Sequence, residues 1–185
     1  MGYSQAQKAE NRERILTLAA AQIRAHGVDS LAIAPLMEAA QLTHGGFYGH
    51  FPSREALVSA AIERALADGS AGAARAKGKT LAEIARSYLS RRHRDAPQSG
   101  CAIAAIGGET ARADAGSRAA MAAHIEAFIA GVRPHTGSDD DAALAVSAMV
   151  GALILSRVIP DQTASDRFLK QVQQALDNIG RSHAD

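Results

Sequence analysis

The stretch from Leu42 to Leu57 constrains the fold more than any other part of the chain. It reads Leu-Thr-His-Gly-Gly-Phe-Tyr-Gly-His-Phe-Pro-Ser-Arg-Glu-Ala-Leu. Thr43 is a favourable N-cap for a short helical segment over residues 44–50, and Ser53 is one for the longer helix that follows. The stretch therefore predicts a short helical segment, a turn and the start of a longer helix, within a few residues of one another.

Apolar residues recur at helical spacing along most of the chain, and no segment alternates with period two. Gly27 is a helix-ending signal, and the first ten residues and residues 95–100 are expected to be loop. We expect an all-α chain with helices over residues 11–25, 33–40, 44–50, 54–70 (fraying over 68–72), 79–94, 101–113, 115–132, 139–157 and 164–180.

The charge balance does not by itself indicate nucleic-acid binding. The 185 residues carry a formal net charge of +1, and residues 1–64 hold six Lys or Arg and six Asp or Glu. Affinity for DNA would therefore depend on where the charges lie and not on their sum.

The first three predicted helices form a unit that can present its third segment to a DNA major groove. Glycines in that segment let the backbone approach base edges or phosphates closely. Tyrosine and histidine can donate hydrogen bonds to phosphate oxygens, and an arginine at the start of the next helix can bind a phosphate there. Phe47 and Phe51, four residues apart, are expected to anchor the segment to the core. The candidate DNA contacts are Thr43, His44, Gly45, Gly46, Tyr48, His50 and Arg54.

This segment resembles the signature of the TetR family of transcriptional regulators. The matching residues are Tyr48, His50, Phe51, Pro52, Ser53, Arg54, Glu55 and Leu57, and the pattern from Ile15 to Val28 also matches. The resemblance is specific over residues 11–66. It implies a helix-turn-helix DNA-binding domain over residues 1–53, a connecting helix over about 54–70, and a helical ligand-binding and dimerisation domain over residues 71–185.

The same resemblance implies a function. It predicts a homodimer that binds double-stranded operator DNA, most simply as a repressor, and that a small-molecule effector releases. Four departures concern the second helix and the turn after it. Ala32 and Pro35 are unusual at the start of the second helix. Leu36-Met37 stands where the family usually has Ile-Ala, and Gln41 occupies the turn position that is usually Gly. A left-handed residue there would cost Gln about 1 kcal/mol, so either the turn differs or it tolerates the strain.

Two regions are expected to bind the effector and the second chain. The helix over residues 142–159 is apolar on more than one side, which favours pairing with another chain, although an ordinary buried helix pair has the same pattern. Met and Phe suit an adaptable apolar cavity between the middle helices, although the same residues would be plain core without one. The candidate lining residues are Tyr88, Ile103, Ile106, Met121, His124, Ile125, Phe128 and Met149.

The one cysteine, Cys101, excludes an intrachain disulfide and opens a predicted helix. The field at a helix start favours a thiolate, so a redox or electrophile sensor on the same DNA-binding frame is an alternative; a small buried hydrophobe is the simpler interpretation. The seven histidines show no paired ligand spacing, and we expect no metal or cofactor.

A helical-bundle enzyme or small-molecule carrier is the alternative from another class. No catalytic constellation supports it, since Glu109 and Arg112 on one helix face suggest a surface ion pair. The longest apolar stretch, residues 142–155, is interrupted by Ser147 and Gly151, so no membrane span is expected. The polar N-terminus lacks a signal-peptide pattern, which favours the cytoplasm.

Overall fold

A computed structural model describes residues 4–74 and 80–181, and within these ranges the chain is helical, with no strand. Four of the helical segments are short 3₁₀ turns, labelled η. The elements are α1 (Gln5–His26), η1 (Val28–Ser30), α2 (Ile33–Ala39), η2 (His44–Gly49), α3 (Arg54–Ala74), α4 (Leu81–Tyr88), α5 (Arg91–Asp95), η3 (Pro97–Ser99), α6 (Ala102–Thr110), α7 (Ala115–Val132), η4 (Arg133–His135), α8 (Asp139–Val158) and α9 (Gln162–Arg181).

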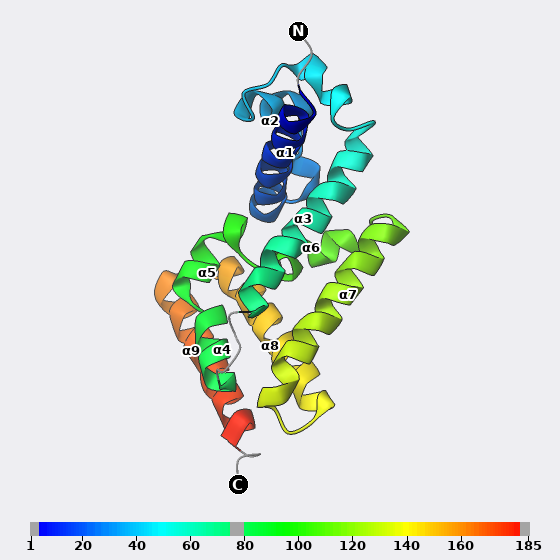
Figure 1. Ribbon diagram of the computed structural model, residues 1–185. Coiled ribbons are helices and arrows are strands. Elements are labelled where there is room, and N and C mark those ends of the chain that lie inside the picture. Colours follow the sequence, from blue (N-terminus) through cyan, green and yellow to red (C-terminus); the bar gives the residue numbers. More distant parts are fainter. Residues whose placement is uncertain (1–3, 75–79, 182–185) are drawn as a thin grey trace.

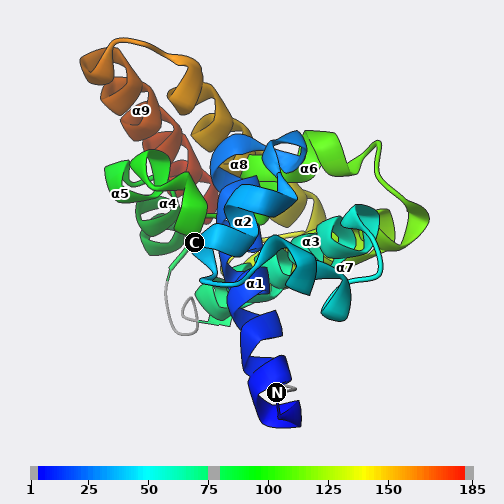
Figure 2. The ribbon, with the colours of Figure 1, turned by 90° about the horizontal axis from the view of Figure 1, so that it is seen from above.

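The elements form an elongated molecule, and different helices form its two ends. Figure 1 shows α1 and α2 at the end that carries the N-terminus, and α4 and α9 at the opposite end. The long helix α3 runs from the first end into the body of the molecule. Seen from above, α4, α5 and α9 lie on one side of α1 and α7 lies on the other (Figure 2).

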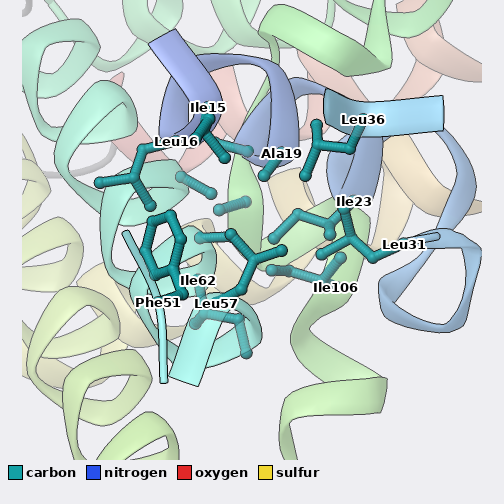
Figure 3. Close-up of a cluster of buried hydrophobic side chains, with 14 of the residues drawn as sticks. Ile15, Leu16, Ala19, Ile23, Leu31, Leu36, Phe51, Leu57, Ile62 and Ile106 are labelled. Atoms are coloured by element: carbon teal, nitrogen blue, oxygen red, sulfur yellow. The ribbon is translucent and has the colours of Figure 1, made fainter. Parts of the chain in front are cut away.

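The first core joins the N-terminal helices to part of the body. Ile15 and Ile23 of α1 lie among side chains that include Leu36 of α2 and Leu57 of α3 (Figure 3). Phe47 of η2 belongs to the same cluster and is fully buried. Ile106 of α6 and Met121 of α7 belong to the same cluster. A movement of α6 or α7 would therefore be felt directly by the N-terminal helices, because a close-packed core transmits displacement.

The second core lies at the opposite end, among α4, α8 and α9. Its fully buried members include Leu89, Met149, Leu153 and Leu176. Arg94 at the end of α5 joins this end of the molecule through a buried ion pair, since its guanidinium contacts the Asp166 carboxylate of α9 at 2.9 Å.

The side chains of Arg24 and Glu109 tie the N-terminal helices to the body. The buried guanidinium of Arg24 donates to the Gln98 carbonyl at 2.8 Å and pairs with the Asp68 carboxylate at 3.1 Å. The Glu109 carboxylate accepts the Val28 N–H at 2.5 Å. Glu109 therefore joins α6 to η1, which corrects the expectation of a surface pair between Glu109 and Arg112.

The first helix starts earlier than the sequence indicates. The residues expected to be loose begin α1 at Gln5, because the Ser4 hydroxyl accepts the Gln7 N–H at 3.2 Å and caps the helix. The helix ends where expected: Gly27 has φ +85° and donates its N–H to the Ile23 carbonyl at 2.9 Å.

Two other helices also differ from expectation. The helix expected over residues 79–94 is divided into α4 and α5, because Ser90 caps a new start by accepting the His93 N–H at 3.3 Å. The helix expected to fray over residues 68–72 continues as α3 to Ala74.

Helix α8 corrects the expectation that no segment reaches membrane-spanning length. Its 20 residues, Asp139–Val158, are long and apolar enough to cross a bilayer, by length and composition only. The core helix of a soluble protein passes the same test, and seven of its residues are buried here. Helix α8 is thus weak evidence for a membrane.

Candidate DNA-binding surface and effector region

The turn between α2 and η2 is a Schellman motif built on a non-glycine residue. Gln41 has φ +58°, in the left-handed region. The Leu42 N–H donates to the Met37 carbonyl at 2.8 Å and the Gln41 N–H to the Glu38 carbonyl at 2.9 Å, which is the hydrogen-bond pattern of that motif. Of the two alternatives for this position, the structure shows the strained one.

Arg14 of α1 holds this turn from the other side. Its guanidinium donates to the Ala40 carbonyl at 3.1 Å and to the Asn11 side-chain oxygen at 3.0 Å. These contacts satisfy an end carbonyl of α2, so the left-handed conformation of Gln41 is fixed by its surroundings.

The segment after the turn, η2, is a 3₁₀ helix and is anchored by two phenylalanines, as the spacing predicted. Phe47 and Phe51 are buried, with ring centroids 5.9 Å apart. Tyr48 packs edge-on against Phe47 at 5.2 Å and is 67% exposed. The Thr43 side chain does not cap η2, although Thr43 occupies the N-cap position. The anchors fix the backbone and leave the Tyr48 hydroxyl free to reach outward.

The polar and glycine residues of η2 form an open surface. Thr43, His44 and Gly45 are exposed and Gly46 is half-buried. A Cβ added at Gly45 would meet no atom within 4 Å. The folded chain itself therefore makes no steric demand for glycine at that position.

His50 lies at the border between η2 and α1. It is half-buried, and its Nδ1 atom is closed off from solvent without a hydrogen-bond partner. Burial, followed by the charges of Lys8 and Arg12, lowers the pKa of His50. Arg12 also lies over the Phe51 ring, 5.1 Å from its centroid. The sequence interpretation missed both cations of α1, and Ser4 ahead of a helical pattern is the signal that would have extended α1 to Lys8.

Arg54, expected to hold a phosphate, has a contact within the fold. It begins α3, and its Nε–H donates to the Leu31 carbonyl at 3.1 Å. This bond fixes the side chain at the helix start.

All of the residues expected to line an effector cavity except His124 fall into the two cores. Ile106 and Met121 belong to the first core, with Ile103 and Ile125 packed against it. Met149 belongs to the second core, with Tyr88 and Phe128 packed against it. His124 of α7 faces α3, where a Cβ on Gly69 would lie 3.3 Å from its Nε2. Burial lowers the pKa of His124.

One group of these residues is brought together with Cys101. The Tyr88 ring lies 5.5 Å from Phe128 and 4.7 Å from His93, centroid to centroid. The Cys101 N–H donates to His93 Nε2 at 2.9 Å, while His93 Nδ1 bonds the Tyr88 carbonyl at 2.7 Å. This is the Tyr88 cluster: Tyr88, His93, Cys101 and Phe128.

All four residues of the Tyr88 cluster are half-buried, and not every polar group among them has a hydrogen-bond partner. The Tyr88 hydroxyl is buried without a hydrogen-bond partner. Burial, followed by the adjacent Cys101, raises the pKa of Tyr88, and burial lowers the pKa of His93. Both rings are therefore neutral at neutral pH. Sequence reasoning missed His93.

The N-terminal helices match a known protein family. Residues 15–61 match the family model of bacterial regulatory proteins, tetR family. No curated protein matches the chain. The matched residues contain α2, the Gln41 turn and η2, which form a helix-turn-helix DNA-binding unit. By this match, residues 15–61 form a DNA-binding region of the tetR family of bacterial regulatory proteins.

Solved structures extend the likeness to the whole fold. A TetR transcriptional regulator from Chloroflexus aurantiacus is 24% identical, with a TM-score of 0.76 over 93% of this chain and 94% of that one. One from Cytophaga hutchinsonii is 20% identical, with a TM-score of 0.73 over 97% and 98%. The reduced form of E. coli NemR is 20% identical, with a TM-score of 0.71 over 92% and 96%.

Proposed function

We propose that the chain is a cytoplasmic, homodimeric repressor that binds operator DNA through η2 and leaves it when a small molecule binds between the middle helices. The observation that carries the DNA contact is Tyr48, whose ring is 67% exposed beside a buried anchor. A hydroxyl held at the tip of a fixed 3₁₀ turn is suited to donating to a phosphate oxygen. Thr43, His44 and Gly45 extend the same surface.

The exposed apolar side chains of α8 support the dimer. Leu144, Leu155 and Val158 are 56%, 54% and 71% exposed, and Ile154 is exposed beside them. The positions 144, 151, 155 and 158 lie along one face of the helix, and a Cβ on Gly151 would meet no atom within 4 Å. Such a strip loses its contact with water when a second copy covers it, which favours association.

Release by an effector has a physical route in the two contacts between body and N-terminal helices. The residues of η3, which precede Cys101, hold Arg24 through the Gln98 carbonyl, and the far end of α6 holds η1 through Glu109. A ligand at the Tyr88 cluster would touch the start of α6. Any shift of that helix changes how α1 is held, and with it the spacing of the two η2 segments in the dimer.

The test is DNA binding by the purified full-length chain. Fluorescence anisotropy with the intergenic DNA upstream of its own gene, over a range of salt concentrations, should show tight, salt-sensitive binding. An unrelated duplex of the same length is the control and should bind more weakly. Equal affinity for both duplexes at every salt concentration would count against a sequence-specific regulator.

A thiol switch at Cys101 is a second candidate, favoured by the Tyr88 cluster and by the likeness to a protein described in a reduced form. The Cys101 thiol would add across the activated carbon–carbon double bond of an electrophilic effector: the β-carbon would bond to the Cys101 sulfur, the π bond would break, and the thiol proton would go to the α-carbon. The added group would crowd Tyr88 and His93. Cys101→Ser separates the candidates: a non-covalent effector still releases DNA from this variant, whereas a thiol-reactive one does not.

A further inference from the structure

The imidazole of His93 closes a loop of the chain, residues 93–101, which we call the His93 loop. Its Nε2 atom accepts the Cys101 N–H at 2.9 Å, and its Nδ1 atom bonds the Tyr88 carbonyl at 2.7 Å. A backbone N–H only donates and a carbonyl only accepts, so the hydrogen of the ring is on Nδ1. These two contacts, the His93 latch, require a neutral ring and join the end of α4 to the start of α6.

The backbone of the His93 loop is fitted to this ring. A Cβ added at Gly100 would lie 2.9 Å from His93 Cδ2 and 3.0 Å from its Nε2, which is too close for an ordinary side chain. The ring also packs edge-on against Tyr88, with 4.7 Å between the centroids. Glycine at position 100 therefore lets the backbone pass close enough for the bond between Cys101 and Nε2.

The His93 loop contacts two other parts of the molecule. The Gln98 carbonyl accepts from the buried guanidinium of Arg24 on α1 at 2.8 Å. Arg157 of α8 donates to the backbone carbonyls of His93 and Arg94, each at 3.1 Å. The latch therefore closes the loop through which α8, the helix with the exposed apolar strip, reaches a contact of the N-terminal helices.

We propose that the His93 latch is a proton-operated switch, closed while the ring is neutral and open once it is protonated. A proton from solvent binds Nε2, and the resulting imidazolium carries a hydrogen on both nitrogens. It cannot accept the Cys101 N–H, so the ring and the start of α6 separate. The Gln98 carbonyl then holds Arg24 less firmly, and acid weakens DNA binding. This last effect rests on the proposed DNA-binding function, whereas the latch itself does not.

The surroundings of the ring set the pH at which the latch opens. The titratable and charged groups in the latch or next to it are Tyr88, Arg94, Asp95, Cys101 and Arg157. Burial lowers the pKa of His93, the bond to the Tyr88 carbonyl opposes that shift, and the Arg157 guanidinium adds to it. Asp95 is paired with Arg94 at 2.7 Å. The closed latch is thus fully favoured above the ordinary pKa of 6.5 and is lost as the pH falls from there through the lowered value.

The experiment follows the wild-type, full-length chain by NMR from about pH 7.5 to about pH 5, on either side of the ordinary histidine pKa. The His93 ring signals report its protonation, and hydrogen exchange of the Cys101 amide, corrected for the intrinsic rate, reports opening. Protection of the Cys101 amide should fall with the pH, by at most about tenfold per pH unit, the limit for one proton. The Ile84 amide, bonded to the Thr80 carbonyl at 3.0 Å, should keep its protection.

Two results of this titration would overturn the switch. One is a His93 ring that stays neutral throughout, and the other is Cys101 protection that stays constant while the ring titrates. His93→Gln provides an amide oxygen that accepts the Cys101 N–H without titrating, and exposed His26→Gln on α1 is the matched control. The first variant should lose the pH dependence of Cys101 protection and the second should keep it. The wild-type titration stands even if a variant fails to fold.

DNA binding tests the consequence for the N-terminal helices. The affinity of wild type for the upstream intergenic duplex, divided by that of His93→Gln at the same pH and salt, should fall by up to about tenfold per pH unit as the latch opens. A constant ratio would overturn the link between the latch and DNA binding. If no duplex binds to either chain, the proposed function fails, and amide exchange still decides whether the latch exists.

Discussion

The exposed residues of η2 and of α8 make opposite surfaces on one molecule. On η2 the exposed groups are polar or glycine, with the single Tyr48 presenting a hydroxyl. On α8 the exposed groups include Leu144, Leu155 and Val158. A polar, adaptable surface suits a hydrated nucleic acid, and an apolar strip suits a second protein surface. The polar surface of η2 is therefore suited to DNA, and the apolar strip of α8 is suited to a second protein chain.

The largest expected effect comes from charging the apolar strip. Leu155→Glu should weaken self-association roughly 100-fold, because an unpaired buried charge costs about 3 kcal/mol or more. Light scattering across micromolar concentrations would measure it, with Ala122→Glu on the exposed side of α7 as the control. A Leu155→Glu variant that remains as dimeric as the control would remove α8 from the interface.

Next in size is the loss of the Tyr48 hydroxyl. Tyr48→Ala should lower DNA affinity about tenfold per bound chain, the range for a hydrogen bond to a charged group. Its melting temperature should stay close to that of wild type, because the ring is 67% exposed. Tyr48→Phe should behave like Tyr48→Ala in anisotropy titrations if the hydroxyl makes the contact, and like wild type if only the ring matters.

A methyl group at Gly45 tests how closely the η2 backbone approaches DNA. The added methyl group of Gly45→Ala meets no protein atom. The melting temperature should therefore be unchanged or slightly higher, because alanine loses less backbone entropy on folding than glycine does. DNA affinity at matched salt should nevertheless fall a few-fold if that backbone lies against the duplex. Undiminished affinity would show that Gly45 stands away from it.

The smallest effect is expected inside the turn that positions η2. Gln41→Gly relieves left-handed strain of about 1 kcal/mol but increases the entropy of the unfolded chain by a comparable amount. We therefore expect the free energy of unfolding to rise by no more than about 1 kcal/mol, with η2 and DNA affinity preserved. Chemical denaturation measures the free energy of unfolding. A decrease of more than about 1 kcal/mol in Gln41→Gly would mean that the Gln41 side chain stabilises the turn itself.

Much of the helical framework could be predicted, because helix ends depend on local chemistry. Gly27 ends α1, and Thr80 starts α4 through a capping box with Glu83. The errors are of the same local kind but involve weaker signals. Ser4 and Ser90 each start a helix by accepting one N–H, and a serine within a polar sequence is easily taken for loop.

The site was harder to predict than the fold. The exposure of Tyr48 and the burial of Phe47 follow from apolar spacing. A hollow between α1 and η2 is lined by both His50 and Lys8. Lys8 lies 42 positions earlier in the sequence, on a helix whose first turns were expected to be loose. His93 contacts Cys101 after the helix is interrupted at Ser90, and no hydrophobic periodicity predicts that contact. Glu109 was expected at the surface, but its partner is a backbone N–H that no side-chain pattern reveals.

The most direct test of the account is a hydroxyl-radical footprint of the chain on its own operator, with the number of bound chains measured by sedimentation. We predict two protected segments whose centres are about 10 base pairs apart, or a multiple of that spacing, with two chains bound. One protected segment with a single chain bound would contradict a dimer that places two η2 segments in successive major grooves.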